Sequence, residues 1–212
     1  MSDAPLILTF DTSAAHCAAA LFRGSDEVAA RMEPMARGQA ERLMPLLEDV
    51  LAEGGVRWRD LAALAVLTGP GNFTGIRISV AAARGLAMAL GVPAIGVTAF
   101  EGLGVGLPEN GLIVLDNRRN GYAWWRCGEV GTGDRDALCA AAAGASMIRG
   151  HEAEALGREL GLPWDGPRVP ELSAVADVAR GRLGSDVPPA APFYLRPADA
   201  ALPSDPPPPI LP

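Results

Sequence analysis

The sequence predicts an α/β protein. It should begin with three short antiparallel strands, continue as alternating helices and parallel strands, and end in a smaller second lobe. Two observations support this prediction. Short apolar runs separated by turn signals open the chain, and apolar residues at helical spacing then alternate with β-rich runs. With 212 residues, 49% hydrophobic and 20% charged, the chain has the composition of a globular protein.

The elements follow from these two kinds of spacing. We expect strands at 6–10, 17–22, 27–32, 61–68, 94–98, 112–116 and 122–126, and helices at 39–53, 76–90, 153–160 and 172–183. Pro45 should kink the first helix or mark its true start. We divide the chain into an N-terminal lobe at 1–104, a smaller, degenerate C-terminal lobe at 105–197 and a flexible proline-rich tail at 198–212.

Charge and cysteine content exclude several classes of function. The net charge is −7 and all 18 basic residues are arginines, so the chain is poorly suited to grip a polyanion by itself. The three cysteines form no C-x-x-C pair, as expected of a reduced protein. The first residues lack the basic region of a signal peptide, and no uninterrupted apolar run approaches ~20 residues. We therefore expect a cytoplasmic protein without membrane contact.

A glycine-rich turn, T-G-P-G-N-F-T-G-I-R at 68–77, joins a predicted strand to a predicted helix. Its glycines permit backbone conformations and close approaches that a Cβ would block, and Asn72 or Thr74 can cap the helix. Such a turn suits an anion, because free N–H groups meet the positive end of a helix dipole. No lysine follows the glycines, and their G-x-G-x-x-x-G spacing is not a dinucleotide fingerprint. A demanding turn without any ligand is the alternative.

Two further stretches leave alternatives open. Asp11-Thr12-Ser13 follows the first strand and is either an Asx-type turn or a loop that faces a phosphate or a metal. The predicted helix 76–90 is rich in alanine and glycine. It either packs flat on its own sheet or offers a second face to a partner helix.

Several segments recur together in one family. They are L-I-L-T-F-D-T-S at 6–13, E-R-L-M-P at 41–45, the glycine turn at 68–77, I-G-V-T at 95–98, D-N-R-R at 116–119 and Y-L-R at 194–196. On these segments the chain resembles the bacterial TsaB (YeaZ) family of tRNA threonylcarbamoyladenosine biosynthesis proteins. The likeness covers residues 6–126 and is local at 193–197.

The resemblance implies an actin-like ATPase (sugar kinase-like) fold and a catalytically silent paralogue of TsaD, which transfers a threonylcarbamoyl group to the adenosine beside the anticodon of tRNA. It implies a heterodimer with TsaD that TsaE joins, tRNA bound only through the complex, and a homodimer when the chain is alone. The helices at 39–53 and 76–90 should make this contact through Leu43, Leu47, Ile76, Val80, Ala83 and Ala87. On this basis Ala83→Arg or Ala87→Arg should disrupt a dimer.

The resemblance also bears on the site. It implies no catalytic residue and no cofactor for the isolated chain, with ATP or ADP in the complex. The loops that would face a nucleotide contain Asp11, Thr12, Ser13, Gly69, Gly71, Asn72 and Thr74. Relatives with a metal use two histidines on the helix aligned with 39–53. This chain has only His16 and His151, and Gln39 stands where relatives often keep one histidine, so we expect no metal.

An enzyme of the same superfamily is the alternative, either a small-molecule kinase or a metallopeptidase. Asp116 stands near the place of a catalytic carboxylate, but Arg118 and Arg119 follow it. A carboxylate paired with arginine is a poorer base, so we expect pairing. Arg77 could contact either a partner or an acidic group of its own fold, and the sequence does not rank these options.

Overall fold

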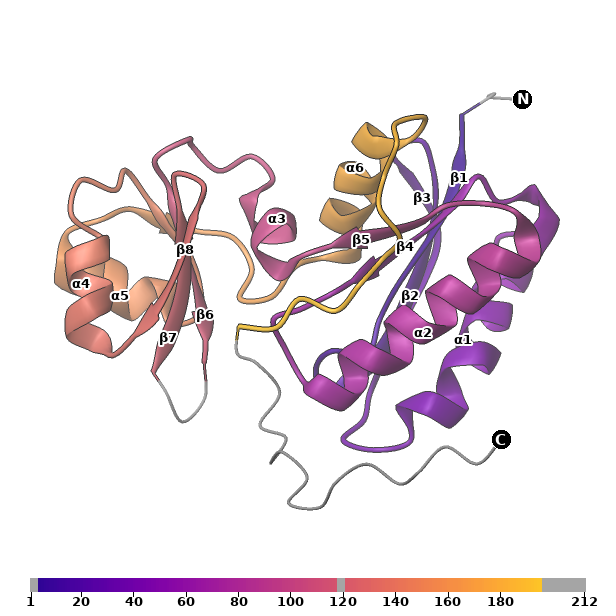
Figure 1. Cartoon of the computed structure of the whole chain (residues 1–212), viewed down its shortest axis with the longest axis horizontal. Helices are drawn as coiled ribbons and strands as arrows, with labels where there is room; N and C mark the ends of the chain where they lie inside the picture. Colours follow the sequence, from indigo (N-terminus) through magenta and orange to yellow (C-terminus); the bar gives the residue numbers. More distant parts are fainter. Residues whose placement is uncertain (1–3, 118–120, 196–212) are drawn as a thin grey trace, which may run out of the picture.

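The computed structural model describes residues 4–117 and 121–195, which form two five-stranded sheets flanked by helices (Figure 1). The first sheet has the strand order β3-β2-β1-β4-β5. Its strands are β1 (Leu6–Asp11), β2 (His16–Arg23), β3 (Asp26–Pro34), β4 (Ala63–Leu67) and β5 (Ala94–Val97). β1 to β3 form the predicted antiparallel meander, whereas β4 and β5 continue the sheet in parallel with β1. The predicted fold class is confirmed.

The second sheet repeats the topology of the first. Its strands are β6 (Leu112–Asp116), β7 (Tyr122–Arg126), β8 (Glu129–Gly133), β9 (Ile148–Gly150) and β10 (Trp164–Asp165). Their order is β10-β9-β6-β7-β8, with β6 to β8 antiparallel and β9 and β10 parallel to β6. This is the order of the first sheet with β6 in the place of β1. The smaller lobe is therefore a shortened second version of the same arrangement.

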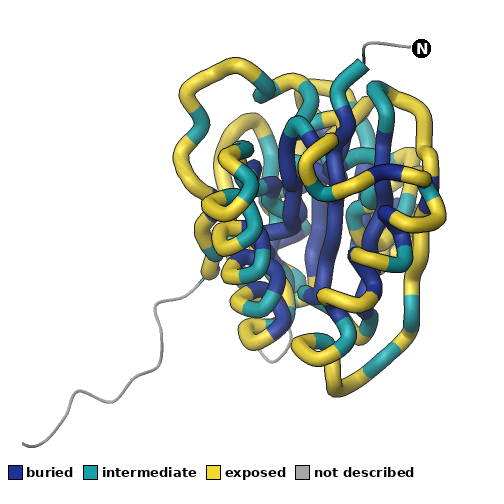
Figure 2. The backbone as a smooth tube through the Cα atoms, turned by 90° about the vertical axis from the view of Figure 1, so that its right-hand side faces the viewer, coloured by how far each residue is buried: buried dark blue, intermediate teal, exposed yellow. Residues whose placement is uncertain are grey.

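The helices cover both faces of each sheet. Successive side chains of a strand point to opposite faces, and the central strands β1, β4 and β6 are buried almost throughout, so both faces are covered. On the first sheet, α1 (Gln39–Glu53) and α2 (Phe73–Leu90) cover the face of Leu8 and Phe10, and α6 (Leu172–Arg182) covers the face of Ile7. On the second sheet, α4 (Arg135–Ala141) and α5 (Ala153–Leu160) lie on one face and α3 (Ala99–Gly104) on the other. Figure 2 shows the buried strands between helices whose outer sides are exposed.

The chain returns to the first sheet after completing the second. Val175 and Ala179 of α6 are fully buried against β1, β4 and β5. The Arg182 side chain donates a hydrogen bond to the Gly96 carbonyl at 2.7 Å and forms an ion pair with Glu101 at the start of α3. The segment after α6, which is yellow in Figure 1, then follows the end of the sheet, where the Phe193 amide donates to the Thr68 carbonyl at 2.8 Å.

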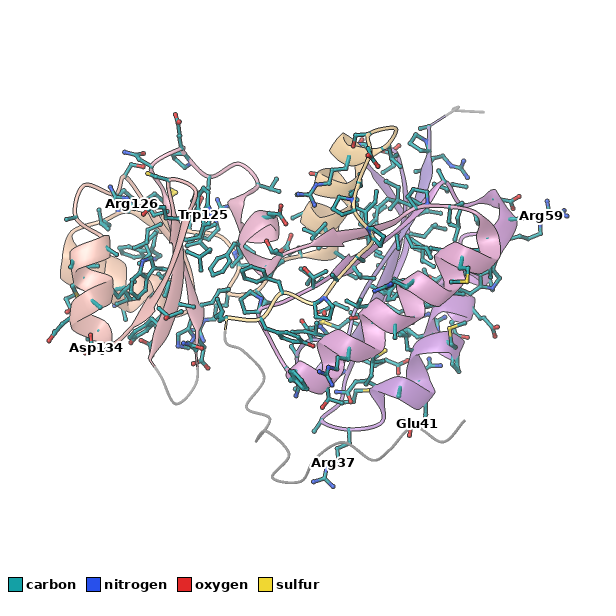
Figure 3. All side chains as sticks on the ribbon, viewed as in Figure 1. Arg37, Glu41, Arg59, Trp125, Arg126 and Asp134 are labelled. Atoms are coloured by element: carbon teal, nitrogen blue, oxygen red, sulfur yellow. The ribbon has the colours of Figure 1, made fainter. Side chains whose placement is uncertain are left out.

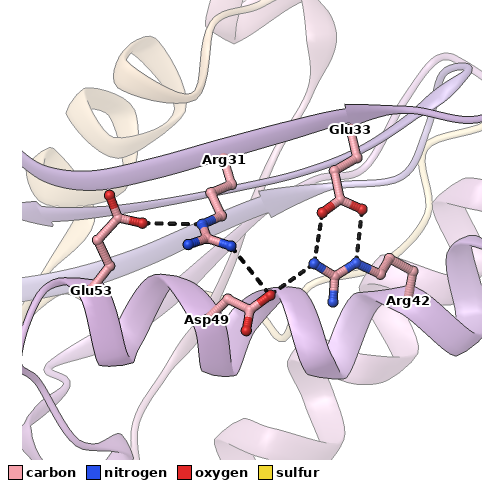
Figure 4. Close-up of polar contacts among 5 residues, drawn as sticks. All are labelled: Arg31, Glu33, Arg42, Asp49 and Glu53. Atoms are coloured by element: carbon pink, nitrogen blue, oxygen red, sulfur yellow. Dashed lines mark hydrogen bonds and ion pairs between the residues drawn. The ribbon is translucent and has the colours of Figure 1, made fainter.

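An ion-pair network joins α1 to the edge strand β3 (Figure 4). Arg42 donates two hydrogen bonds to Glu33, at 2.6 and 2.7 Å, and a third to Asp49 at 2.8 Å. Arg31 extends the network to Glu53 at 3.0 Å. Hydrogen bonds from Arg42 lower the pKa values of both Glu33 and Asp49. The side chains of Arg42, Glu33 and Asp49 are 28%, 36% and 41% exposed, so solvent screens the network and its contribution to stability is small.

Several element boundaries differ from the prediction. α1 runs through Pro45 without ending there. α2 begins three residues earlier than predicted, because the Asn72 side chain accepts a hydrogen bond from the Gly75 amide at 3.1 Å and caps the helix. The short elements α3, α4, β8, β9 and β10 were missed. Arg196 and the proline-rich tail lie outside the described residues.

By length and composition alone, α2 is apolar enough to span a membrane. The core helix of a globular protein passes the same test, and Ile76, Val80 and Ala83 of α2 are buried against the first sheet. The helix thus gives no argument for membrane insertion.

Candidate functional site

The two turns expected to face a nucleotide lie against each other. The turn after β1 contains Asp11, Thr12 and Ser13, and the glycine turn leads from β4 into α2. The Asn72 amide donates to the Ser13 carbonyl at 2.7 Å, and the Thr12 hydroxyl donates to the Gly75 carbonyl at 2.6 Å. Thus residues from two separate segments form one compact unit at the carboxyl ends of parallel strands, where α/β sheets commonly bind ligands.

The glycines of the motif are explained by packing within the chain. Gly69 has φ +105°, which side chains rarely adopt. A Cβ at Gly75 would lie 1.8 Å from the Thr12 carbonyl oxygen, and a Cβ at Gly71 would lie 2.8 Å from that of Ser13. The motif therefore lets two turns approach each other without requiring a phosphate. Of the predicted site residues, Thr12 and Gly69 are buried and Gly71 and Thr74 are exposed, and their contact with a nucleotide stays a prediction.

Asp11 holds its own turn in place. One carboxylate oxygen accepts the Ser13 amide at 2.7 Å, which is the Asx-type turn considered for this stretch. The other lies 2.8 Å from Nε2 of His16 at the start of β2. The sequence reasoning missed this pair, although a tight hairpin after Asp11 was a sufficient signal that His16 returns alongside it. The hydrogen bond to Asp11 raises the pKa of His16, and partial burial of the ring opposes this rise.

The pair predicts a pH-dependent part of the stability. A raised pKa in the folded state means that protonation of His16 stabilises the fold, fully below its unfolded pKa of about 6.5. This contribution should disappear as the pH rises through the folded pKa. The free energy of unfolding of the wild type should exceed that of His16→Gln by more at about pH 5.5 than at about pH 9, as measured by urea denaturation. Asp11→Asn should remove the same pH-dependent difference, and parallel curves for wild type and His16→Gln would refute the assignment.

Arg77 contacts its own fold. Its guanidinium lies 3.9 Å from the ring centroid of Phe73, and Nε donates to the Tyr194 hydroxyl at 3.0 Å. The Phe73 and Tyr194 rings are 4.9 Å apart. The glycine turn and the late Y-L-R segment are thus brought together at the first turn of α2, a contact that the sequence reasoning did not find.

The second lobe contributes little to this site. Asp116 lies at the end of β6, the place that Asp11 has on β1, and its side chain is exposed. The predicted pairing with Arg118 or Arg119 falls outside the described residues. Among residues 4–117 and 121–195, no group of three His, Cys, Asp or Glu side chains is placed to hold a metal ion.

The predicted partner-facing residues need correction. Leu43, Leu47, Ile76, Val80 and Ala83 are at most 3% exposed and pack in the core of the first lobe, and Ala87 is half-buried beside them. The apolar stripe that reveals a helix is the stripe that packs on the sheet, so the five buried side chains do not face a partner, and the contact of Ala87 with a partner stays a prediction. Ala83→Arg is accordingly expected to disturb the core rather than an interface. The outward side of α2 carries Ala81, Arg84, Gly85, Met88 and Ala89.

Comparison with known proteins assigns the chain to a family. Residues 33–141, half of the chain, match the family described as "TsaD: tRNA N6-adenosine threonylcarbamoyltransferase". The tRNA threonylcarbamoyladenosine biosynthesis protein TsaB of Escherichia coli is 34% identical over 123 residues, which cover 56% of this chain and 53% of that protein. The TsaB of Haemophilus influenzae is 33% identical over 54% of this chain and 50% of that protein. The chain thus spans about half the length of the curated relatives it matches.

The fold agrees with this match. The structure of YeaZ from Pseudomonas aeruginosa superimposes with a TM-score of 0.71 at 25% identity, covering 89% of this chain and all of that one. The chain therefore belongs to the TsaB/YeaZ family, within the tRNA N6-adenosine threonylcarbamoyltransferase (TsaD) domain family.

Proposed function

We propose that this chain acts in the threonylcarbamoyladenosine modification of tRNA as a non-catalytic subunit that binds and activates TsaD. Family membership supports the pathway. The observation that supports a subunit role is the exposed side of α2, where small residues surround Met88, which is 86% exposed. Small side chains let a second helix approach closely, because interaxial distance depends on the residues at the contact.

The neighbouring helix enlarges this surface. Met44 of α1 is 38% exposed, and Figure 1 shows α1 and α2 side by side on the same face of the first sheet. Arg37 and Glu41 point into solvent at the start of α1 (Figure 3). An apolar centre with a charged rim is the usual composition of a protein interface. The same surface would serve a homodimer when TsaD is absent.

The paired turns are compatible with a silent subunit. The amides of Asn72 and Gly75 are already engaged by Ser13 and by the Asn72 side chain, so fewer free donors remain for a phosphate. We therefore expect ATP or ADP to bind to the complex with TsaD and TsaE rather than to the isolated chain. We expect tRNA to bind through the same complex. Titration calorimetry of the isolated chain with ATP should give no affinity in the micromolar range.

Gly85→Arg should abolish co-purification with TsaD. It should also abolish the restoration of tRNA modification in a mixture with TsaD, TsaE and the enzyme that supplies threonylcarbamoyl-adenylate. A Cβ at Gly85 meets nothing within 4 Å, so the variant should fold normally, and the new charge would be buried unpaired only in the interface. Gly181→Arg on α6 is the matched control, since that site is equally open and lies on the opposite face of the sheet.

Unchanged binding of TsaD by a folded Gly85→Arg variant would place the interface elsewhere. Modification that proceeds equally well without this chain would end the proposal. ADP release by the isolated chain on a small-molecule substrate would instead support the kinase alternative.

A further inference from the structure

A polar cavity lies at the β10 edge of the second sheet, in the lobe that does not contain α1 and α2 (Figure 1). Its volume is about 570 Å³, within the range of about 300 to 1,000 Å³ that is usual for ligand pockets. α5, β10 and the turn at 166–168 form its walls. Among the described residues, these walls share none with the paired turns or with the outward side of α2. The cavity is therefore separate from the surfaces discussed above.

Trp164 provides an aromatic wall of this cavity. The residue lies on the edge strand β10 and is 42% exposed. A Cβ at Gly157 of α5 would lie 2.8 Å from its Cε3 atom, so the ring rests against the helix where the helix carries no side chain. The Arg158 guanidinium lies 5.7 Å from the ring centroid, within the usual range of a cation–π contact. The ring is thus supported by α5 while the residue borders the cavity.

The acidic side chains of the cavity already have partners within the chain. Three carboxylates line it, and each accepts a hydrogen bond: Glu152 from Tyr122 at 2.8 Å, Glu154 from Arg158 at 2.6 Å, and Asp165 from Arg149 at 2.9 and 3.1 Å. Pairing with these donors reduces the repulsion that the carboxylates would exert on an anion.

Arg168 is the basic side chain of the cavity that has no such partner. It is exposed, and among residues 4–117 and 121–195 its guanidinium has neither an ion pair nor a hydrogen bond. It follows a turn in which Gly166 has φ +73°, a conformation that side chains rarely adopt. The cavity therefore offers one guanidinium to an anion beside an aromatic ring.

This combination is the chemistry of single-stranded nucleic acid binding, in which bases stack on aromatic side chains and arginine contacts the phosphate. We propose that the cavity binds one unpaired nucleotide of the tRNA substrate, with the base on Trp164 and the phosphate at Arg168. The inference rests on the proposed function, because it adds a tRNA contact to the complex with TsaD and TsaE. A single contact is compatible with the net charge of −7, since the rest of the complex would supply most of the affinity.

The isolated chain tests the cavity without TsaD. A short single-stranded oligoribonucleotide is titrated at low salt into isotope-labelled protein, and the indole N–H signals of the four tryptophans are followed by NMR. The Trp164 signal, identified by its loss in Trp164→Phe, should shift at millimolar RNA. The other three signals should not shift. Arg168→Gln should weaken the response, because the phosphate contact is lost.

The complex with TsaD and TsaE tests the tRNA contact. The Kd of labelled tRNA is measured by fluorescence anisotropy at several salt concentrations. Trp164→Leu should raise Kd about tenfold, as expected for the loss of one stacked base, whereas Trp164→Phe keeps a ring and should retain most of the affinity. Arg168→Gln should raise Kd about fourfold near 0.15 M salt and lower the slope of log Kd against log salt by about 0.7, the value for one phosphate of a single strand.

Arg59→Gln is the matched control. Arg59 is 70% exposed and lies at the opposite end of the molecule, so the same loss of charge there should leave the Kd of tRNA unchanged (Figure 3). Every variant should co-purify with TsaD as the wild type does, because α1 and α2 are not altered.

An unshifted Trp164 signal in the isolated chain would overturn the cavity as a nucleotide site, whether or not TsaD binds. A shifted signal with an unchanged Kd of tRNA in the Trp164→Leu complex would overturn the tRNA contact and leave a free nucleotide as the ligand. Absence of a wild-type complex with TsaD would overturn the proposed function and the tRNA contact together. Co-purification detects that outcome before any tRNA is added.

Discussion

Gly75→Ala is expected to destabilise the protein by about 3 kcal/mol, the upper range for overpacking. A Cβ at this position would lie 1.8 Å from the Thr12 carbonyl oxygen and 2.8 Å from the carbonyl carbon. Both atoms belong to the backbone and cannot rotate away. α2 and the β1–β2 turn would therefore have to separate, which would break the hydrogen bonds of Asn72 to Ser13 and of Thr12 to Gly75.

Thermal unfolding would measure this loss. For a chain of this length, about 3 kcal/mol corresponds to a decrease in Tm of about 10 °C. Gly181→Ala is the matched control, because that helical glycine is open and alanine there should stabilise by about 0.5 kcal/mol. A Gly75→Ala variant as stable as the wild type would show that the two turns do not pack as described.

Arg149→Met is expected to cost about 3 kcal/mol as well, by removing a buried set of hydrogen bonds. The side chain is 11% exposed and reaches from β9 to the end of α3. Nη1 donates to the carbonyls of Leu103 at 2.8 Å and Val105 at 2.7 Å, while Nε and Nη2 donate to Asp165 at 2.9 and 3.1 Å. Methionine fills similar space but leaves these carbonyls without donors.

Two further variants separate the causes of this effect. Asp165→Asn should cost only about 1 kcal/mol, because its side chain is 45% exposed and water can replace the lost interaction. Arg158→Met on α5 removes an exposed i,i+4 pair and should change the stability by less than about 0.5 kcal/mol. If Asp165→Asn were as costly as Arg149→Met, the ion pair between β9 and β10 rather than the carbonyl contacts to α3 would account for the loss of stability.

The sequence predicted the first lobe well because its signals are local. The stripe from Leu43 to Leu51 and the apolar run at 63–67 have clear periods, and Asn72 is a standard helix cap. The same apolar stripe was wrongly predicted to contact a partner. Periodicity identifies the apolar face of a helix, but it does not show whether the helix's own sheet or another protein covers that face. In the second lobe, β9 has only three residues, which is too short to show an alternating apolar pattern. β8 reads E-V-G-T-G, and its glycines obscure such a pattern.

The site was predicted only in part, for a similar reason. The turn-forming residues at 11–13 and 69–75 predicted two loops that could face a ligand. The parallel pairing of β1 with β4 brings these loops together. The docking of Tyr194 on Phe73 and Arg77 links positions more than a hundred residues apart. No local pattern reports such a contact. The family resemblance showed only that the two segments occur in the same proteins. It did not predict that they are in contact.

The return of α6 to the first sheet has a consequence for synthesis on the ribosome. All five strands of that sheet have been made once Val97 is complete, yet the face of Ile7 stays open until Val175 and Ala179 emerge. Exposed apolar strands invite wrong pairing, and contacts between residues far apart in sequence form slowly. A nascent chain whose synthesis is stalled after β5 and before α6 should therefore aggregate readily and bind chaperones. The chaperones should dissociate once α6 has emerged and covered the sheet.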